Sequence, residues 1–142
     1  DWLPADETPK DTTRILTPHP GEAARMLGCN PDEIQQDRLA ATRQLATTHG
    51  ATIVLKGRHT IIGQADGPVL VNPTGNSGLA QGGSGGVLTG FIGGLLAQPQ
   101  FHNRAVQAIA YATWQHGNAA DQLASNGDYW GMDELINTLA CR

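Results

Sequence analysis

A glycine-rich run at residues 72–86 is the segment of this sequence best suited to chemistry. It holds six glycines and leads at once into apolar residues at helical spacing from Val87 to Leu96. Glycine lets backbone N–H groups approach an anion closely, and the start of a helix adds a partial positive charge. The run therefore predicts a site in which main-chain amides before Val87 hold the oxygens of a phosphoryl group.

The same run also has a simpler interpretation. Its stretch Gly82-Gly83-Ser84-Gly85-Gly86 is similar to a flexible connector, although such a linker seldom runs straight into an amphipathic helix. It is not a P-loop, since the sequence has no GxxxxGK[ST] motif. A dinucleotide-binding fingerprint would follow the first strand, and this run lies much later in the chain.

Further candidates lie at the end of a predicted strand and at the start of a predicted helix. The strand 52–55 is followed by Lys56, Gly57, Arg58, His59 and Thr60. Open α/β sheets bind ligands beyond the carboxyl ends of their strands, so Lys56 either meets a phosphate or is a solvated turn lysine. His19 lies between two prolines that restrict its backbone, which favours a positioned side chain, and a loop histidine of no consequence fits the sequence equally well. Glu22 is most simply a first-turn acid.

Strands and helices alternate along the chain, which predicts an α/β fold with a mostly parallel sheet. Caps, prolines and glycines delimit the elements. The predicted elements are a strand at 14–17, a helix at 20–27, a helix from Pro31 to Gly50 capped by Asn30 and Glu33, a strand at 52–55, a hairpin of 60–62 with 69–71, a helix from Val87, a helix at 101–124 and a last helix capped by Asp133.

Composition excludes several classes of protein. The 142 residues carry a net charge of 9 − 13 = −4, only 15% are charged, and 18 are glycine, which suits one globular domain and not a disordered chain or coiled coil. No basic stripe suggests nucleic-acid binding, and no apolar run reaches the ~20 residues of a membrane span. With no basic-then-apolar leader at its start, we expect a cytoplasmic protein.

Other residues of chemical interest favour structural interpretations. Cys29 and Cys141 lie far apart without a CxxC motif, which predicts free thiols. His116 and Asp121 lie five apart in a helical stretch and share a face poorly, so no metal site is expected. The tryptophans, Trp2, Trp114 and Trp130, are expected to pack against the fold.

Four motifs in order resemble those of the ADP-dependent NAD(P)H-hydrate dehydratase family. Residues 16–28 read LTPHPGEAARMLG and resemble the family's LTPHPGE segment, and residues 54–60 read VLKGRHT and look like its LKGxxT. Asn72 to Gly90 is similar to NPTGNxGMAxGGxGDVLxG, and residues 111–121 are similar to a helix ending HGxAAD. The resemblance covers nearly the whole sequence.

This resemblance implies a ribokinase-like fold and the repair of hydrated NADH and NADPH. In the family, ADP or ATP, with or without Mg²⁺, phosphorylates the hydroxyl of the damaged nicotinamide ring, and loss of phosphate restores the dihydropyridine. By motif, the segment 56–60 contacts the nucleotide and His19 contacts the hydrate. The residues matching the loop around the phosphates are Asn76, Gly82, Gly83, Ser84 and Gly85.

The sequence departs from the family pattern in two ways. The family loop ends Gly-x-Gly-Asp, and that aspartate is the expected general base, whereas this chain has Gly86 there. Glycine cannot accept a proton, so we expect nucleotide binding with weak or absent turnover. The chain is also about half as long as the family domain, so residues 1–142 are expected to form a single partial domain, the C-terminal half of a layered αβα domain. Such a cut exposes a sheet edge, which predicts self-association or pairing with the absent half.

Three functions follow from these observations. The first is a lyase of the hydrate-repair family, and the second is a non-catalytic nucleotide-binding or self-assembling fragment that lacks the general base. The third, a sugar or vitamin kinase of the same fold, is weaker because LTPHPGE and LKGxxT point to the repair family.

Overall fold

A computed structural model describes residues 12–127 and 129–140. Four short strands form one sheet in the order β1-β2-β3-β4. They are β1 (Ile15–Leu16), β2 (Thr52–Leu55), β3 (Ile61–Gly63) and β4 (Leu70–Val71). The α/β fold is as expected, but the described sheet is mixed: β1 and β2 are parallel, and the other two pairs are antiparallel. The links between β2, β3 and β4 are too short for the crossover that parallel strands need.

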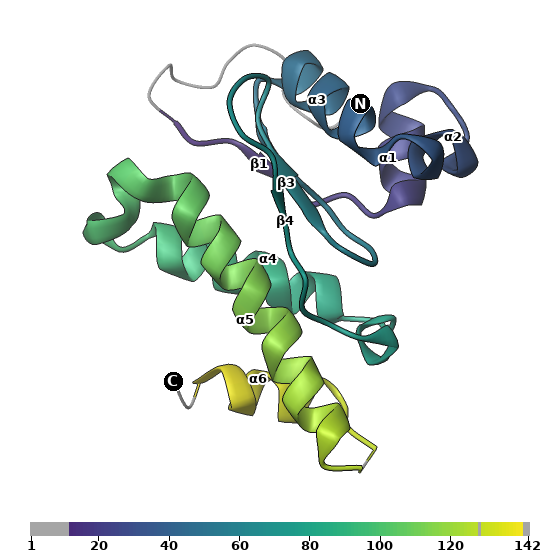
Figure 1. The fold of residues 1–142 in the computed structure, drawn as a ribbon. Coiled ribbons are helices and arrows are strands. Elements are labelled where there is room, and N and C mark those ends of the chain that lie inside the picture. Colours follow the sequence, from purple (N-terminus) through teal and green to yellow (C-terminus); the bar gives the residue numbers. More distant parts are fainter. Residues whose placement is uncertain (1–11, 128, 141–142) are drawn as a thin grey trace.

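Three helices cover one face of the sheet (Figure 1). They are α1 (Pro20–Leu27), α2 (Pro31–Gln36) and α3 (Arg38–His49). Ile53 and Leu55 of β2 point into this layer, where they pack with Leu45 of α3, and all three side chains are fully buried. Burial of alternate β2 residues on this face therefore joins the three helices to the sheet.

The predicted single helix from Pro31 to Gly50 is wrong. Asp37 ends α2 and begins α3, with φ −142° and ψ 80° and a side chain that accepts a hydrogen bond from the amide of Ala40. Aspartate satisfies helix N-terminal amides well, so it starts a new helix here instead of continuing the first. The break places Arg38 at the first position of α3.

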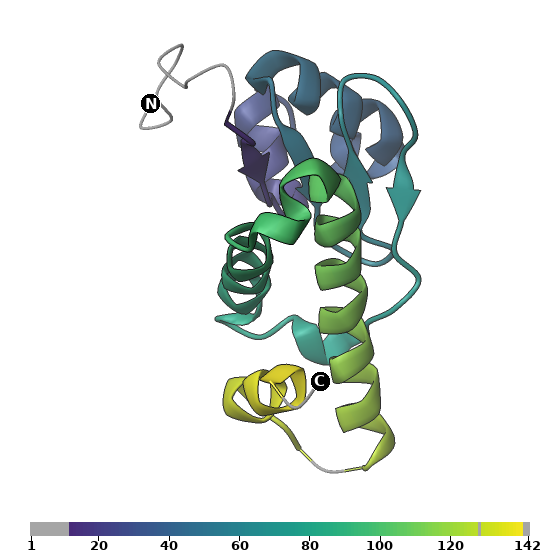
Figure 2. The same cartoon turned by 90° about the vertical axis from the view of Figure 1, so that its left-hand side faces the viewer.

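The opposite face of the sheet packs on α4 (Ser84–Leu96) and α5 (Ala105–Ser125), which a 3₁₀ helix, η2 (Pro99–Arg104), connects. Val54 and Ile62 point into this layer and meet Leu88 and Ile109. Figure 2 shows α4 and α5 running beside each other against the sheet. The three layers are therefore helix, sheet and helix. The helix predicted from Val87 begins three residues earlier, at Ser84, and the helix predicted from 101 begins as η2.

The last element, α6 (Met132–Ala140), packs on the far end of α5. Its Leu135 is buried with Ala119, Ala120 and Trp130, beside the short 3₁₀ helix η1 (Ser77–Leu79). Trp130 packs as predicted, Trp114 is 41% exposed, and Trp2 lies outside the described residues. Cys29 is a free thiol, and Cys141 also lies outside the described residues. None of the described helices combines the length and hydropathy needed to span a membrane.

Candidate nucleotide-phosphate site

Lys56 follows β2 directly and lies at the start of α4. Its amide donates to the carbonyl of Pro18 at 2.8 Å, which joins the end of β2 to the segment before α1. Its Nζ lies 3.7 Å from the carboxylate of Glu22 and would be only 2.8 Å from a Cβ added at Gly85. The fold thus brings together residues that lie 29 positions apart in the sequence, from 56 to 85.

The first turn of α4 carries free backbone donors. Its N-cap, Gly83, has φ +97°, which glycine adopts readily, and offers no side chain to cap the helix. Among the described hydrogen bonds, the amides of Gly85 and Gly86 have no protein acceptor. Unsatisfied amides at a helix start bind anions, and the ammonium of Lys56 beside them adds a full positive charge. This arrangement of donors and positive charge, which we call the cradle, suits an anion, and the phosphate site at the glycine-rich run stays a prediction.

The loop that leads into α4 is fastened to α5. Asp121 accepts hydrogen bonds from the amide of Gly75 at 2.8 Å and from Nδ2 of Asn76 at 3.0 Å. Thr74 donates through its hydroxyl to the carbonyl of Trp114 at 2.9 Å. Thr74 also packs tightly against Gly117: a Cβ added to Gly117 would lie 2.3 Å from the Thr74 hydroxyl and 2.7 Å from the Thr74 backbone. The loop is therefore an ordered part of the fold, and the flexible-connector interpretation is wrong.

The other end of the loop rests on Trp130. A Cβ on Gly78 would lie 2.4 Å from the indole ring, so the backbone contacts the ring directly. Gln81 donates to the carbonyls of Gly78 and Trp130 at 2.8 and 3.2 Å. Asn76 accepts from the amide of Gly78 at 2.9 Å, which closes the turn before η1. The side-chain amide of Asn76, a predicted loop residue, thus stabilises the loop both as a donor to Asp121 and as an acceptor from Gly78.

His116 of α5 contacts the first residue of α4. Its Nε2 lies 3.5 Å from the hydroxyl of Ser84, and both side chains are buried. Burial lowers the pKa of His116, the positive charge of Lys56 lowers it further, and the Ser84 backbone opposes these two effects. The imidazole is therefore neutral at physiological pH and adds no second cation to the cradle.

His19 caps α1. Its Nδ1 accepts from the amides of Gly21 and Glu22 at 3.1 and 3.3 Å, and the Glu22 carboxylate accepts from the His19 amide at 2.7 Å. The other ring nitrogen lies 3.3 Å from Glu22, which also faces Lys56, so one carboxylate links the two predicted site residues. Glu22 is the predicted first-turn acid.

The turn after Lys56 has an unusual backbone. Gly57 has φ +134° and His59, although not a glycine, has φ +54°. The Thr60 hydroxyl donates to the Gly57 carbonyl at 3.0 Å, while the side chains of Arg58 and His59 are exposed. Non-glycine residues at positive φ cluster at binding sites, where the surrounding structure holds them.

Three residues build this site through contacts that the sequence does not reveal. Arg38 lies in no motif, whereas Gly117 and Asp121 belong to the motif at 111–121 without any role predicted for them. Their partners lie 17 to 46 positions away, and no local pattern marks such contacts. Across the described residues, no group of three or more His, Cys, Asp or Glu is placed to hold a metal ion. A cavity of about 430 Å³ lies at the other end of β2, between Gly50 and Gln64, and no predicted site residue lines it.

The layered α/β structure is similar to part of a ribokinase-like domain. A ribokinase-like superfamily protein from Enterococcus faecalis superposes with a TM-score of 0.71 and 34% identity, over 88% of this chain and 42% of that one. The sequence profile of NAD(P)H-hydrate dehydratase matches residues 4–140, and the chain belongs to that family. The resemblance found in the motifs is thereby confirmed.

Two relatives show how much of the family protein is present. The ADP-dependent (S)-NAD(P)H-hydrate dehydratase of Neisseria meningitidis is 50% identical over 109 residues, which is 75% of this chain and 35% of that protein. An ADP/ATP-dependent NAD(P)H-hydrate dehydratase from Bacillus subtilis, co-crystallised with ATP and Mg²⁺, has a TM-score of 0.82 and 38% identity over 90% of this chain and 46% of its own. The chain therefore spans about a third to a half of these relatives.

Proposed function

We propose that this chain binds ADP or ATP at the start of α4 and is a NAD(P)H-hydrate repair lyase by descent, with its chemical step weakened by Gly86. The observation that carries the proposal is the pair of unpartnered amides at Gly85 and Gly86 beside the ammonium of Lys56. The Neisseria relative is named as ADP-dependent and the Bacillus relative as ADP/ATP-dependent.

The nucleotide would meet two sets of groups. Lys56 and the segment 57–60 would contact it from the end of β2, while Asn76 and the segment 82–85 would surround its phosphates. The amides and the Lys56 ammonium stabilise the negative charge of the phosphoryl oxygens. Mg²⁺, where it takes part, would enter on the phosphates themselves, since it is held in nucleotide sites largely by phosphate oxygens and water.

The reaction implied by the family needs a base where this chain has Gly86. A carboxylate there would take the proton of the ring hydroxyl as that oxygen attacks the terminal phosphorus of the nucleotide. The bond from this phosphorus to the bridging oxygen would break, releasing AMP from ADP or ADP from ATP. In the second step the C–O bond would break, and loss of phosphate together with a proton from the adjacent ring carbon would restore the dihydropyridine. Absence of a positioned base typically costs about 10²–10⁴-fold in rate. The amide of Gly86 remains, so binding should survive the loss of catalysis.

Position 86 can accept the missing side chain. No heavy atom lies within 4 Å of a Cβ added there, and the residue lies within the regular first turn of α4. Gly86→Asp should therefore fold, and Gly86→Ala supplies the matched control, because it adds the Cβ without the carboxylate.

The test combines calorimetry with an activity assay on the whole chain. ADP and ATP are titrated into the protein and into Lys56→Met, and recovery of NADH from its hydrate is followed by absorbance for the parent, Gly86→Asp and Gly86→Ala. We expect nucleotide binding that weakens about tenfold in Lys56→Met, and a gain of about 10²-fold or more for Gly86→Asp alone. No binding by the parent would overturn the nucleotide site. Full activity in the parent, or equal rates in Gly86→Asp and Gly86→Ala, would overturn the role given to position 86.

A second candidate function is a non-catalytic nucleotide-binding fragment that self-associates. We propose residues 1–142 as a single partial domain, because β1 has no strand on its outer side among the described residues and the chain spans 35% of the Neisseria relative. Open edges pair readily with other strands. Sedimentation should then give a homo-oligomer at micromolar concentration, or a complex when the missing half is supplied, and a stable monomer in both cases would count against it.

A further inference from the structure

We propose that Arg38, far from the glycine-rich loop in the sequence, is a positioning residue for Lys56 and thereby for the phosphates of the bound nucleotide. The inference rests on the proposed nucleotide site, and it adds a residue that no motif marks. Arg38 does not touch the cradle itself; it acts through the backbone of the turn that follows β2.

The guanidinium of Arg38 binds three carbonyls of that turn. Its Nη1 donates to the carbonyl of Arg58 at 2.7 Å, and its Nη2 donates to the carbonyls of Leu55 at 3.0 Å and Lys56 at 3.2 Å. Arginine presents its donors in a rigid planar fork, so one side chain fixes the relative places of all three carbonyls. Burial lowers the pKa of Arg38, but a guanidinium remains charged at physiological pH.

The turn needs such a partner. Its backbone passes through φ +134° at Gly57 and +54° at His59, so it is not held by regular strand pairing. A Cβ on Gly57 would lie 3.1 Å from Nη1 of Arg38, which shows how closely the guanidinium packs against the turn. A charged donor fork stabilises the carbonyls of Lys56 and Arg58, which lie beyond the last residue of β2, and adds a hydrogen bond to Leu55, the last residue of the strand.

Arg38 is itself held firmly. It is the first residue of α3, whose Ala41, Thr42 and Leu45 are buried against the sheet. The amide of Lys56 is fixed by Pro18 and its carbonyl by Arg38, so both sides of the residue are anchored and Nζ is directed to the start of α4. A shift of about 1 Å in a binding group is enough to weaken it markedly.

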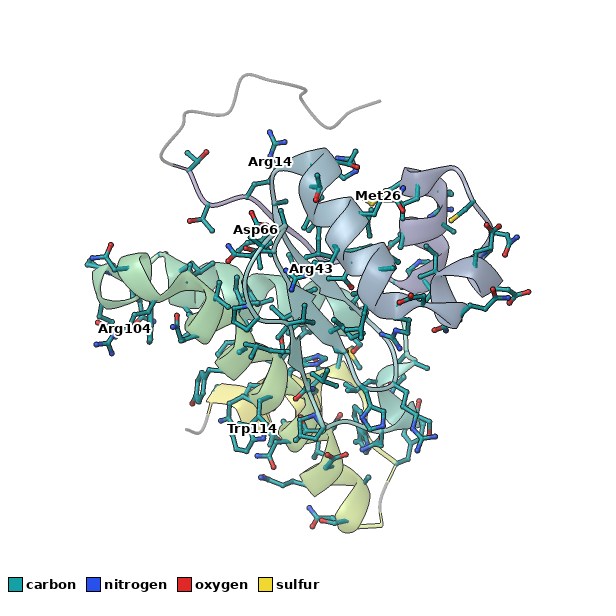
Figure 3. The ribbon with its side chains drawn as sticks, turned by 45° about the horizontal axis from the view of Figure 1, so that its top comes forward. Arg14, Met26, Arg43, Asp66, Arg104 and Trp114 are labelled. Carbon is teal, nitrogen blue, oxygen red and sulfur yellow. The ribbon has the colours of Figure 1, made fainter. Side chains whose placement is uncertain are left out.

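Arg43 provides a matched control within the same helix. It also lies on α3 and also donates to two carbonyls, those of Gln64 and Gly67, but these flank Asp66 in the hairpin turn at the opposite end of β3 (Figure 3). Arg38→Met and Arg43→Met therefore remove the same chemistry from the same helix. We expect Arg38→Met to weaken ADP binding about tenfold and Arg43→Met to leave it within about twofold. Arg38→Lys should resemble Arg38→Met, since one ammonium cannot serve all three carbonyls.

Two measurements separate positioning from general stability. Amide hydrogen exchange across residues 55–60 should rise in Arg38→Met and not in Arg43→Met, with or without nucleotide. In a double-mutant cycle, Arg38→Met should cost no further ADP affinity once Lys56 is methionine, because Arg38 acts through Lys56.

Each outcome bears on the inference. Equal losses of affinity in the two methionine variants, full rescue by Arg38→Lys, or additive losses with Lys56→Met would overturn it. If the parent protein binds no nucleotide, the proposed function fails, and amide hydrogen exchange alone tests whether Arg38 positions the turn. Faster exchange at residues 55–60 in Arg38→Met than in Arg43→Met supports this role of Arg38, and equal exchange refutes it.

Discussion

Replacing Asp121 with alanine removes the main tie between α5 and the glycine-rich loop. Asp121 accepts from the amide of Gly75 at 2.8 Å and from the side chain of Asn76 at 3.0 Å. The variant leaves both donors without a protein acceptor. We expect the loop to loosen and the protein to lose stability.

The size of the loss follows from opposing effects. A hydrogen bond to a charged group contributes about 1.5–3 kcal/mol, and there are two. Asp121 is half-buried, so water replaces part of what is lost. It also lies near the carboxyl end of α5, where removal of a negative charge returns about 0.3–1 kcal/mol. The free energy of unfolding should therefore fall by about 1–3 kcal/mol.

Urea unfolding followed by far-ultraviolet circular dichroism measures this change. Asp121→Asn is the matched control, because its one carbonyl oxygen can still accept from Gly75 while its amide faces the Asn76 donor. We expect it to lose about half as much as Asp121→Ala, and both to bind ADP more weakly. A loss under about 0.5 kcal/mol in the alanine variant would refute the reasoning, since it would mean that water serves the loop as well as α5 does.

Three further outcomes are expected. Gly117→Ala places a Cβ 2.3 Å from the Thr74 hydroxyl and 2.7 Å from the Thr74 backbone. Thermal melting should therefore show a loss of about 1–3 kcal/mol in the free energy of unfolding. An unchanged melting temperature would contradict the close packing. Burial lowers the pKa of His116, so the unfolded chain binds a proton more readily than the folded chain does. The free energy of unfolding should therefore decline as the pH falls below the ordinary histidine pKa of 6.5. Thermal melts across pH 5–8 should show a smaller decline for His116→Gln. Leu45→Ala, at a fully buried position, should cost about 2–5 kcal/mol in urea unfolding, whereas a near-neutral result would deny it a place in the core.

Local signals in the sequence predicted most of the elements. Pro20 and Gly28 mark the ends of α1, Asn30 and Glu33 form the predicted capping box of α2, and the continuous apolar run 52–55 is a strand buried on both faces. These features depend on neighbours in sequence, so residue types alone define them.

The sequence-based predictions are wrong or incomplete where distant contacts or competing local preferences determine the structure. The start of α4 at Ser84 was placed too late because two glycines in the first turn favour helix poorly, and packing on α5 overrides that preference. The capping role of His19 was not anticipated, since histidine is an uncommon N-cap. The contacts of Arg38 and Asp121 could not be predicted, because their partners lie elsewhere in the chain.

Trp130 gives the molecule an optical reporter of its own. Its indole ring lies directly against the backbone of Gly78, and its carbonyl binds Gln81, so any rearrangement of that segment changes the surroundings of a fluorophore that is only 7% exposed. Emission from this ring therefore registers loop motion without an attached dye. Replacing Trp114 with phenylalanine would remove a competing signal from a more exposed tryptophan and sharpen the reading.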